Sequence, residues 1–144
     1  MPENLIKPKE IILVEDYEND AEQAKRVLEQ LGLTQLVRWL KDGASARTYL
    51  SSIQNSADAP AILLLDLKLP FISGFEVLKS LRGNAVFDRT LKIALSSLDD
   101  AASIKQAYVL GADAFLIKPL TIEDLREAME SFSVPGLSAA QERR

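Results

Sequence analysis

Polar side chains that could together bind a cation and a phosphoryl group follow four short apolar runs of the chain. Glu15 and Asp16 follow the first run, Asp66 the second, Ser96 the third and Lys118 the fourth. Carboxylate oxygens suit a hard divalent cation, a hydroxyl can donate to a phosphoryl oxygen, and an ammonium supplies a countercharge. Gathered in one place, these groups would form a site for a divalent cation and a phosphoryl group. The four runs are residues 11–14, 61–65, 93–95 and 114–117.

The apolar runs also predict the elements that would bring these side chains together. Each run is three to five residues long and is typical of a strand buried on both faces, as in a parallel sheet. Between the runs the apolar residues recur with a helical period, so we expect five strands alternating with five helices in a doubly wound α/β sandwich. Ligands of such sheets bind in the crevice beyond the carboxyl ends of the strands. The other expected elements are a strand at 34–40 and helices from about Glu18 to Gly32, from Ala44 to Ser52, after Gly74, from Asp99 to Gly111 and from Thr121 to Pro135.

Local signals refine two of these helices and one turn. Asp42-Gly43 indicates a turn, and Thr121 followed by Asp124 indicates a cap for the last helix. The fourth helix should bury its periodic apolar residues. These are Ile104, Ala107 and Tyr108.

Composition and charge exclude several classes of protein. With 144 residues, 47% of them apolar, the chain suits one domain with an ordinary core. The net charge of -4 argues against nucleic acid as a ligand, because phosphate backbones attract clusters of Lys and Arg. The chain has neither cysteine nor histidine, so any phosphohistidine must belong to a partner. Neither a signal peptide nor a membrane span is visible, and a cytoplasmic location is expected.

The acidic pair Glu15-Asp16 stands where a nucleotide-binding fold would have a glycine-rich phosphate loop. Bare carboxylates repel phosphate, so this loop can meet a phosphoryl group only through a cation. Mg²⁺ fits best, because it takes carboxylate, carbonyl and water oxygens and is usually shared with phosphate. The alternative is that the two acids simply favour the N-terminus of the helix that follows.

Each of the other three groups also has an ordinary interpretation. Asp66 could attack a phosphoryl donor and form an acyl phosphate, or it could be a solvated carboxylate at a strand end. Ser96 could bind a phosphoryl oxygen, although serines after strands are common. Lys118 could be a surface lysine, but Pro119 restricts it: a trans bond would extend the chain, whereas a cis bond would turn it and aim the lysine inward. The conjunction of all four favours one site.

This pattern resembles the receiver domain of two-component response regulators over about residues 8–132, with residues 133–144 expected as a flexible tail. Thirty residues separate Asp66 from Ser96 and 22 separate Ser96 from Lys118, close to the family's intervals, and Leu69-Pro70 to Gly74 also matches. The resemblance implies a flavodoxin-like fold with strand order 2-1-3-4-5. Finer features look like the single-domain regulators that are paired with bacterial phytochrome-type kinases. They are Val14-Glu15-Asp16 with Asp20 beyond, Asp42-Gly43, Leu65-Asp66-Leu67 and residues 107–113 before Lys118-Pro119.

The resemblance assigns the metal site residue by residue. It makes Asp66 the phosphoacceptor and places Glu15 and Asp16 with it at a magnesium ion. Lys68 would lend its backbone carbonyl to the same ion. Asp66 would therefore be both a metal ligand and the nucleophile.

The resemblance also assigns the phosphoryl contacts and the switch. Ser96 and Lys118 would bind the phosphoryl oxygens, and Phe115 matches the aromatic side chain that turns inward, together with Ser96, on phosphorylation. Ser73 stands where the family usually has Asp, and Ser96 replaces the commoner Thr. Leu98, which flanks the site, is apolar and cannot orient a hydrolytic water, so slow loss of the phosphoryl group is expected.

The function implied is a phosphorylation switch that catalyses only its own Mg²⁺-dependent aspartyl phosphorylation and dephosphorylation. Its expected partners are a sensor histidine kinase, of the phytochrome type by the narrower resemblance, and a downstream protein. No DNA-binding output domain is expected after residue 131, so the output would be a protein contact through the last two helices and the strand of Phe115. A homodimer through that surface is a further expectation.

Two other functions compete with this interpretation. A phosphatase that uses an aspartyl phosphate would resemble Asp-x-Asp, but Lys68 occupies the position of the second carboxylate, so the proton carrier is missing. An adaptor with a receiver fold that acts without phosphorylation is the other alternative. It would need no complete site, whereas here every expected group is present.

Overall fold

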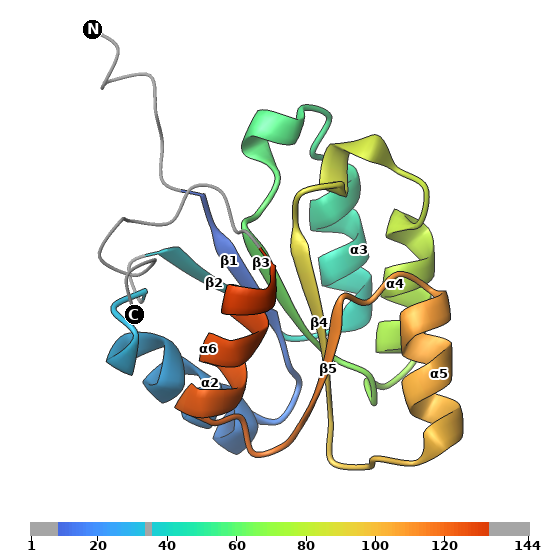
Figure 1. Ribbon diagram of the computed structural model, residues 1–144. Helices are drawn as coiled ribbons and strands as arrows, with labels where there is room; N and C mark the ends of the chain where they lie inside the picture. Colours follow the sequence, from blue (N-terminus) through green and yellow to red (C-terminus); the bar gives the residue numbers. More distant parts are fainter. Residues whose placement is uncertain (1–8, 34–35, 133–144) are drawn as a thin grey trace, which may run out of the picture.

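A parallel sheet of five strands forms the centre of the computed structural model, which describes residues 9–33 and 36–132. Its order is β2-β1-β3-β4-β5, as the resemblance implies (Figure 1). The predicted strand at 34–40 is observed from Val37, because Leu36 lies in a 3-10 turn instead. Residues 34 and 35 and the expected tail at 133–144 lie outside the described residues. The strands are β1 (Ile11–Val14), β2 (Val37–Leu40), β3 (Ile62–Asp66), β4 (Leu91–Ser96) and β5 (Ala114–Ile117).

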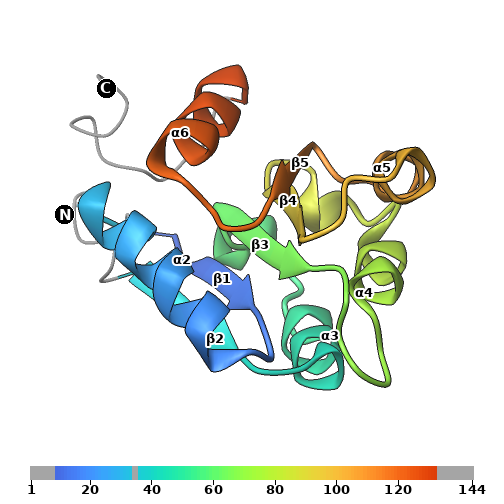
Figure 2. The same ribbon diagram turned by 90° about the horizontal axis from the view of Figure 1, so that it is seen from below.

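Within the same described ranges, five α-helices cover the two faces of the sheet, so the predicted doubly wound architecture is confirmed. Seen along the sheet, α2 and α6 lie on one face and α3, α4 and α5 on the other (Figure 2). Among the described helices, none combines the length and the apolar composition that crossing a lipid bilayer requires. The helices are α2 (Glu18–Gln30), α3 (Gly43–Ser51), α4 (Gly74–Leu81), α5 (Ala101–Val109) and α6 (Ile122–Ser131), and two short 3-10 turns are η2 (Ser56–Asp58) and η3 (Ala85–Phe87).

The core has two layers, one on each side of the sheet. Alternate side chains of a strand point to opposite faces, so Ile11 and Leu13 of β1 pack on the side of α2 and α6, and Ile12 and Val14 pack on the other side. Both faces of β1 and β3 are buried, which explains why these strands are continuous apolar runs rather than alternating ones. The central strands therefore hold the residues that follow them in fixed positions.

Side-chain hydrogen bonds cap the N-termini of α3, α4, α5 and α6, whereas α2 begins without one. Thr121 accepts a hydrogen bond from the amide of Asp124 at 3.1 Å, as the sequence predicts. Ser73 and Glu76 form a complete capping box, so a serine where the family usually has Asp still starts α4. The predicted turn at Asp42-Gly43 is instead the start of α3, with Asp42 as its cap. The same polar residue that favours a turn also favours a helix N-terminus.

Helix α5 is less buried than its sequence pattern indicates. Ala107 is fully buried, but Tyr108 is 47% exposed and Val109 is 54% exposed. The prediction that Tyr108 packs inward is therefore wrong. The physical reason is position: α5 packs beside β5, the edge strand, whose own residues are only partly buried, so the described part of the chain leaves one side of the helix uncovered.

Candidate functional site

The acidic residues at the ends of β1 and β3 meet in one crevice at the carboxyl edge of the sheet. One carboxylate oxygen from each of Glu15, Asp16 and Asp66 lies within 4.8 Å of the others. Glu15 and Asp66 are only 1% and 3% exposed, whereas Asp16 is exposed. All the strands run parallel, so the loops after β1, β3, β4 and β5 gather at the lower edge of the molecule in Figure 1.

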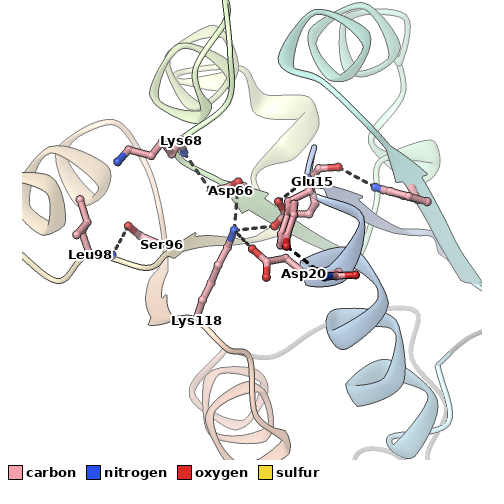
Figure 3. A network of polar contacts seen from close by, with 10 residues as sticks. Glu15, Asp20, Asp66, Lys68, Ser96, Leu98 and Lys118 are labelled. Atoms are coloured by element: carbon pink, nitrogen blue, oxygen red, sulfur yellow. Dashed lines mark hydrogen bonds and ion pairs between the residues drawn. The ribbon is translucent and has the colours of Figure 1, made fainter.

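The ammonium of Lys118 lies among these carboxylates (Figure 3). Its Nζ is 2.8 Å from Glu15 Oε1, 3.2 Å from Asp66 Oδ2 and 3.0 Å from Asp20 Oδ2. An ammonium has three hydrogens to donate, so these three acceptors satisfy it. The Lys118–Pro119 bond is cis, the second of the two conformations that the sequence leaves open. Because its ammonium contacts three carboxylates, Lys118 is part of the site and not an ordinary surface residue.

Backbone groups hold the two buried carboxylates in place. Glu15 Oε2 accepts from the amide of Tyr17 at 3.1 Å, and Asp66 Oδ1 accepts from the amide of Lys68 at 3.1 Å. The indole N–H of Trp39 donates to the backbone carbonyl of Glu15 at 2.9 Å, which ties the edge strand β2 to the acidic loop. One oxygen of each carboxylate is thus fixed by the chain, and the other faces Lys118.

The charges of this crevice do not balance. Burial raises the pKa of Glu15 to about 7, and the negative charge of Asp66 adds to this effect, while the hydrogen bond from Lys118 opposes it. Burial lowers the pKa of Lys118, but the hydrogen bond to Glu15 and the charge of Asp66 outweigh it, so this pKa lies above its usual value. Negative charge is in excess, and it is the kind of excess that a divalent cation with oxygen ligands neutralises. The donor set fits Mg²⁺.

The remaining predicted side chains lie around this network, and among the described residues none of them makes a polar contact with its carboxylates or with Lys118. Ser96 is buried, and its hydroxyl accepts from the amide of Leu98 at 3.0 Å, one strand away from the carboxylates. The side chain of Lys68 extends away from Asp66 (Figure 3). Leu98 is 51% exposed at the mouth of the crevice. Phe115 on β5 is half-buried and packs against the core layer of α3, α4 and α5.

The segment between Asp66 and α4 is held very close to the end of β3. A Cβ on Gly74 would collide with the backbone carbonyl of Asp66, so only glycine allows α4 to start there. The amide of Gly74 also donates to the carbonyl of Leu67 at 3.1 Å. Within this tight loop Phe71 has a φ of 65° and is fully exposed, a rare conformation for a residue with a large side chain.

Two residues of the network are missing from the sequence-based site. Asp20 appears there only as part of the narrower resemblance, and Trp39 only as a strand residue. A usable signal existed for Asp20: it follows Asp16 by four residues at the start of a predicted helix, one helical turn beyond the acidic pair. For Trp39, the partner is a backbone carbonyl, which no residue pattern reveals.

Comparison with known proteins identifies relatives over nearly the whole chain. A family model described as the response regulator receiver domain matches residues 11–130. The probable methanogenesis regulatory protein FilR2 of Methanothrix harundinacea is 34% identical, over 83% of this chain and 78% of its own. The response regulator Rcp1 of Synechocystis sp. is 30% identical, over 87% of this chain and 88% of its own. A solved structure of the Mn²⁺-bound form of response regulator Rcp1 is 28% identical, with a TM-score of 0.68 over 91% of this chain and 98% of that one. The structure of the bacteriophytochrome response regulator AtBRR is 32% identical, with a TM-score of 0.76 over 89% of this chain and 94% of that one.

Proposed function

The chain belongs to the response regulator receiver domain family, and from this premise we propose that it is a phosphorylation switch whose phosphoacceptor is Asp66. The observation that carries the proposal is the crevice itself. Two buried carboxylates, those of Glu15 and Asp66, contact a single lysine, the exposed acid Asp16 lies beside them, and the acids outnumber the lysine. Membership of this family implies a phosphohistidine donor, and since the chain has no histidine, that group belongs to a partner kinase.

In the proposed reaction a carboxylate oxygen of Asp66 attacks the phosphorus atom of the donor. The bond between phosphorus and the imidazole nitrogen breaks, and an acyl phosphate forms on Asp66. Lys118 lies 3.2 Å from this carboxylate and would donate to the phosphoryl oxygens. Mg²⁺, held by Glu15, Asp16, Asp66 and the carbonyl of Lys68, would neutralise the charge of the phosphoryl group.

Ser96 and Phe115 would carry the change from the site to the surface. The Ser96 oxygen accepts from the amide of Leu98, which leaves its own hydrogen to donate to a phosphoryl oxygen. Phe115 lies on the neighbouring strand β5 and is half-buried, so its side chain stands between the core and the surface. An inward turn would change the surface formed by β5 and α5.

That surface is the proposed output. Tyr108 and Val109 of α5 and Ile117 of β5 are all at least 38% exposed, which leaves apolar contact area on this side of the molecule. A downstream protein, or a second copy of the chain, would bind there in response to phosphorylation. The similarity to AtBRR, a bacteriophytochrome response regulator, supports a kinase of the phytochrome type as the donor, and the proposal keeps the expected cytoplasmic location.

The test is incorporation of phosphate from a small donor, acetyl phosphate, with and without Mg²⁺. We expect labelling that needs Mg²⁺ and that disappears in Asp66→Asn, which keeps the shape of the side chain and removes the nucleophile. A receiver domain of known activity serves as the positive control. If that control is labelled and this protein is not, the phosphorylation-independent adaptor becomes the better interpretation.

A further inference from the structure

Asp20 contacts Lys118 without belonging to the acidic cluster. It lies in the first turn of α2, and its Oδ2 is 3.0 Å from Lys118 Nζ (Figure 3). The side chain of Lys118 is 13% exposed and that of Asp20 is 40% exposed, so the carboxylate closes the crevice from the solvent side. The cluster that fits a divalent cation consists of Glu15, Asp16 and Asp66, and Asp20 is not one of its members.

A second contact fixes the position of Asp20 relative to the lysine. Gln23 lies three residues further along α2 and so shares a face of the helix with Asp20. Its Nε2 donates to the backbone carbonyl of Leu120 at 3.2 Å, just beyond Lys118-Pro119. The first turns of α2 thus contact the β5–α6 loop at two points, Lys118 and Leu120. The packing of α2 against this loop therefore fixes the distance between the Asp20 carboxylate and the Lys118 ammonium.

The two other acceptors of Lys118 are carboxylates that a cation would use. A divalent cation on Glu15 and Asp66 would share their oxygens with the lysine and would repel the ammonium at the same time. Asp20 would keep its full negative charge for the lysine under these conditions. Asp20 is therefore the acceptor that remains for the Lys118 ammonium when a cation occupies the crevice.

We propose that Asp20 is a positioning residue, which draws the Lys118 ammonium away from Glu15 and Asp66 so that a cation can bind, and then keeps that ammonium in the crevice to meet the phosphoryl group. The inference rests on the proposed function of Asp66. Loss of the Asp20 charge should leave Lys118 more firmly on the metal carboxylates. Mg²⁺ would then bind more weakly, and Lys118 would be in place less often when the phosphoryl group arrives.

The experiment compares Asp20→Asn with Glu18→Gln, which removes the same charge from the same helical turn at an exposed position. Mg²⁺ is titrated into ¹⁵N-labelled protein, and binding is followed through the amide signals of Tyr17 and Lys68, which donate to Glu15 and Asp66. We expect Asp20→Asn to weaken Mg²⁺ binding by roughly two- to fivefold, the range of a half-exposed ion pair, and Glu18→Gln to change it less. In a Lys118→Met background, Asp20→Asn should no longer change the Mg²⁺ affinity beyond the change caused by Glu18→Gln.

Labelling by acetyl phosphate at saturating Mg²⁺ supplies the second measurement. Here Asp20→Ala should be slower than wild type, and Asp20→Asn, whose amide oxygen can still accept from the ammonium, should recover part of the rate. Equal Mg²⁺ affinities for Asp20→Asn and Glu18→Gln, an unchanged effect in the Lys118→Met background, or equal rates for Asp20→Ala and wild type would each overturn the inference. Absence of labelling in wild type with normal Mg²⁺ binding would count against the proposed function instead.

Discussion

Glu10 and Glu15 stand at the two ends of the same strand, β1, and their carboxylates have opposite environments. At the amino end, Glu10 is 2.8 Å from Arg38 and accepts a hydrogen bond from the Tyr49 hydroxyl at 2.6 Å. Burial raises the pKa of Glu10, but the hydrogen bonds from Arg38 and Tyr49 outweigh it and hold this pKa below its usual value. At the carboxyl end, burial raises the pKa of Glu15 to about 7 although Lys118 is 2.8 Å away.

The difference separates a carboxylate whose charge is matched by a partner from one whose charge is part of an unbalanced group, as the proposed cation site requires. One guanidinium matches the charge of Glu10, whereas Glu15, Asp20 and Asp66 share the ammonium of Lys118, with Asp16 beside them. An excess of buried negative charge does not stabilise a fold. Such an excess is expected of a binding site for a divalent cation.

The largest effect should come from Lys118→Met, which keeps the length of the side chain and removes its charge. Glu15 and Asp66 would then face each other without compensation, and the free energy of unfolding should fall by about 3–5 kcal/mol in Mg²⁺-free buffer. Added Mg²⁺ should restore part of the loss. The matched control substitution is Lys92→Met. In the wild type, the Lys92 ammonium donates to the backbone carbonyls of Phe87 and Thr90. Urea unfolding of that variant should show no Mg²⁺ recovery, and a Mg²⁺ effect of equal size in both would contradict the account.

The two glutamates should respond with opposite signs to the same substitution. Glu15→Gln should stabilise the Mg²⁺-free protein at pH 8 by about 1–3 kcal/mol, because a raised pKa means that the charged form is disfavoured in the fold. This gain should shrink as the pH falls from about 7 towards 4.5, where the native Glu15 becomes protonated.

Glu10→Gln should instead destabilise the protein at neutral pH by about 1 kcal/mol, since solvent screens its half-exposed ion pair. Its lowered pKa means that this contribution is present above the ordinary pKa of glutamate and is lost at more acidic pH. Thermal unfolding between pH 4 and pH 8 measures both variants. If both shift stability in the same direction at pH 8, the contrast between the two ends of β1 is wrong.

Asp16→Asn should separate metal binding from folding. Asp16 is exposed, so its replacement should change the stability of the Mg²⁺-free protein by less than about 0.5 kcal/mol. Wild type should gain about 2.7 kcal/mol at a Mg²⁺ concentration one hundred times its Kd, and most of this gain should be absent in Asp16→Asn. If Asp16→Asn keeps the full stabilisation by Mg²⁺, Asp16 is not a ligand of the metal.

The smallest effect concerns the lifetime of the phosphoryl group. Leu98 is half-exposed beside Ser96 and offers no polar atom to orient water, whereas Leu98→Glu would offer a carboxylate. We expect the variant to lose phosphate severalfold faster than wild type after removal of the donor. Faster loss from wild type than from Leu98→Glu would show that this position does not control hydrolysis.

Much of the fold followed from the sequence because its central strands are buried on both faces. Short continuous apolar runs, as at β1 and β3, are typical of strands in a parallel sheet, and parallel strands bring whatever follows them to one edge. The grouping of Glu15, Asp66 and Lys118 is a consequence of this topology. The edge strand β2 was less sharply predicted, because its residues are only partly buried.

The features that the sequence did not predict depend on how elements pack rather than on what they contain. The contact of Asp20 with Lys118 requires α2 to lie against the β5–α6 loop, and Tyr108 is exposed because α5 covers only the edge of the sheet. The start of α3 is another case: a Cβ on Gly43 would collide with the carbonyl of Ile72 in the loop after β3. Helical periodicity identifies an apolar face but not its neighbour.

The most direct test of the central claim is to map the residue that carries the phosphoryl group. The protein is treated with acetyl phosphate and Mg²⁺, the acyl phosphate is reduced with borohydride, and the modified peptide is sequenced by mass spectrometry. The account predicts modification of Asp66, loss of the signal when Mg²⁺ is chelated, a strong decrease in Glu15→Gln and no decrease in Glu10→Gln. Modification of a different carboxylate, or an equal decrease in the two glutamate variants, would contradict it.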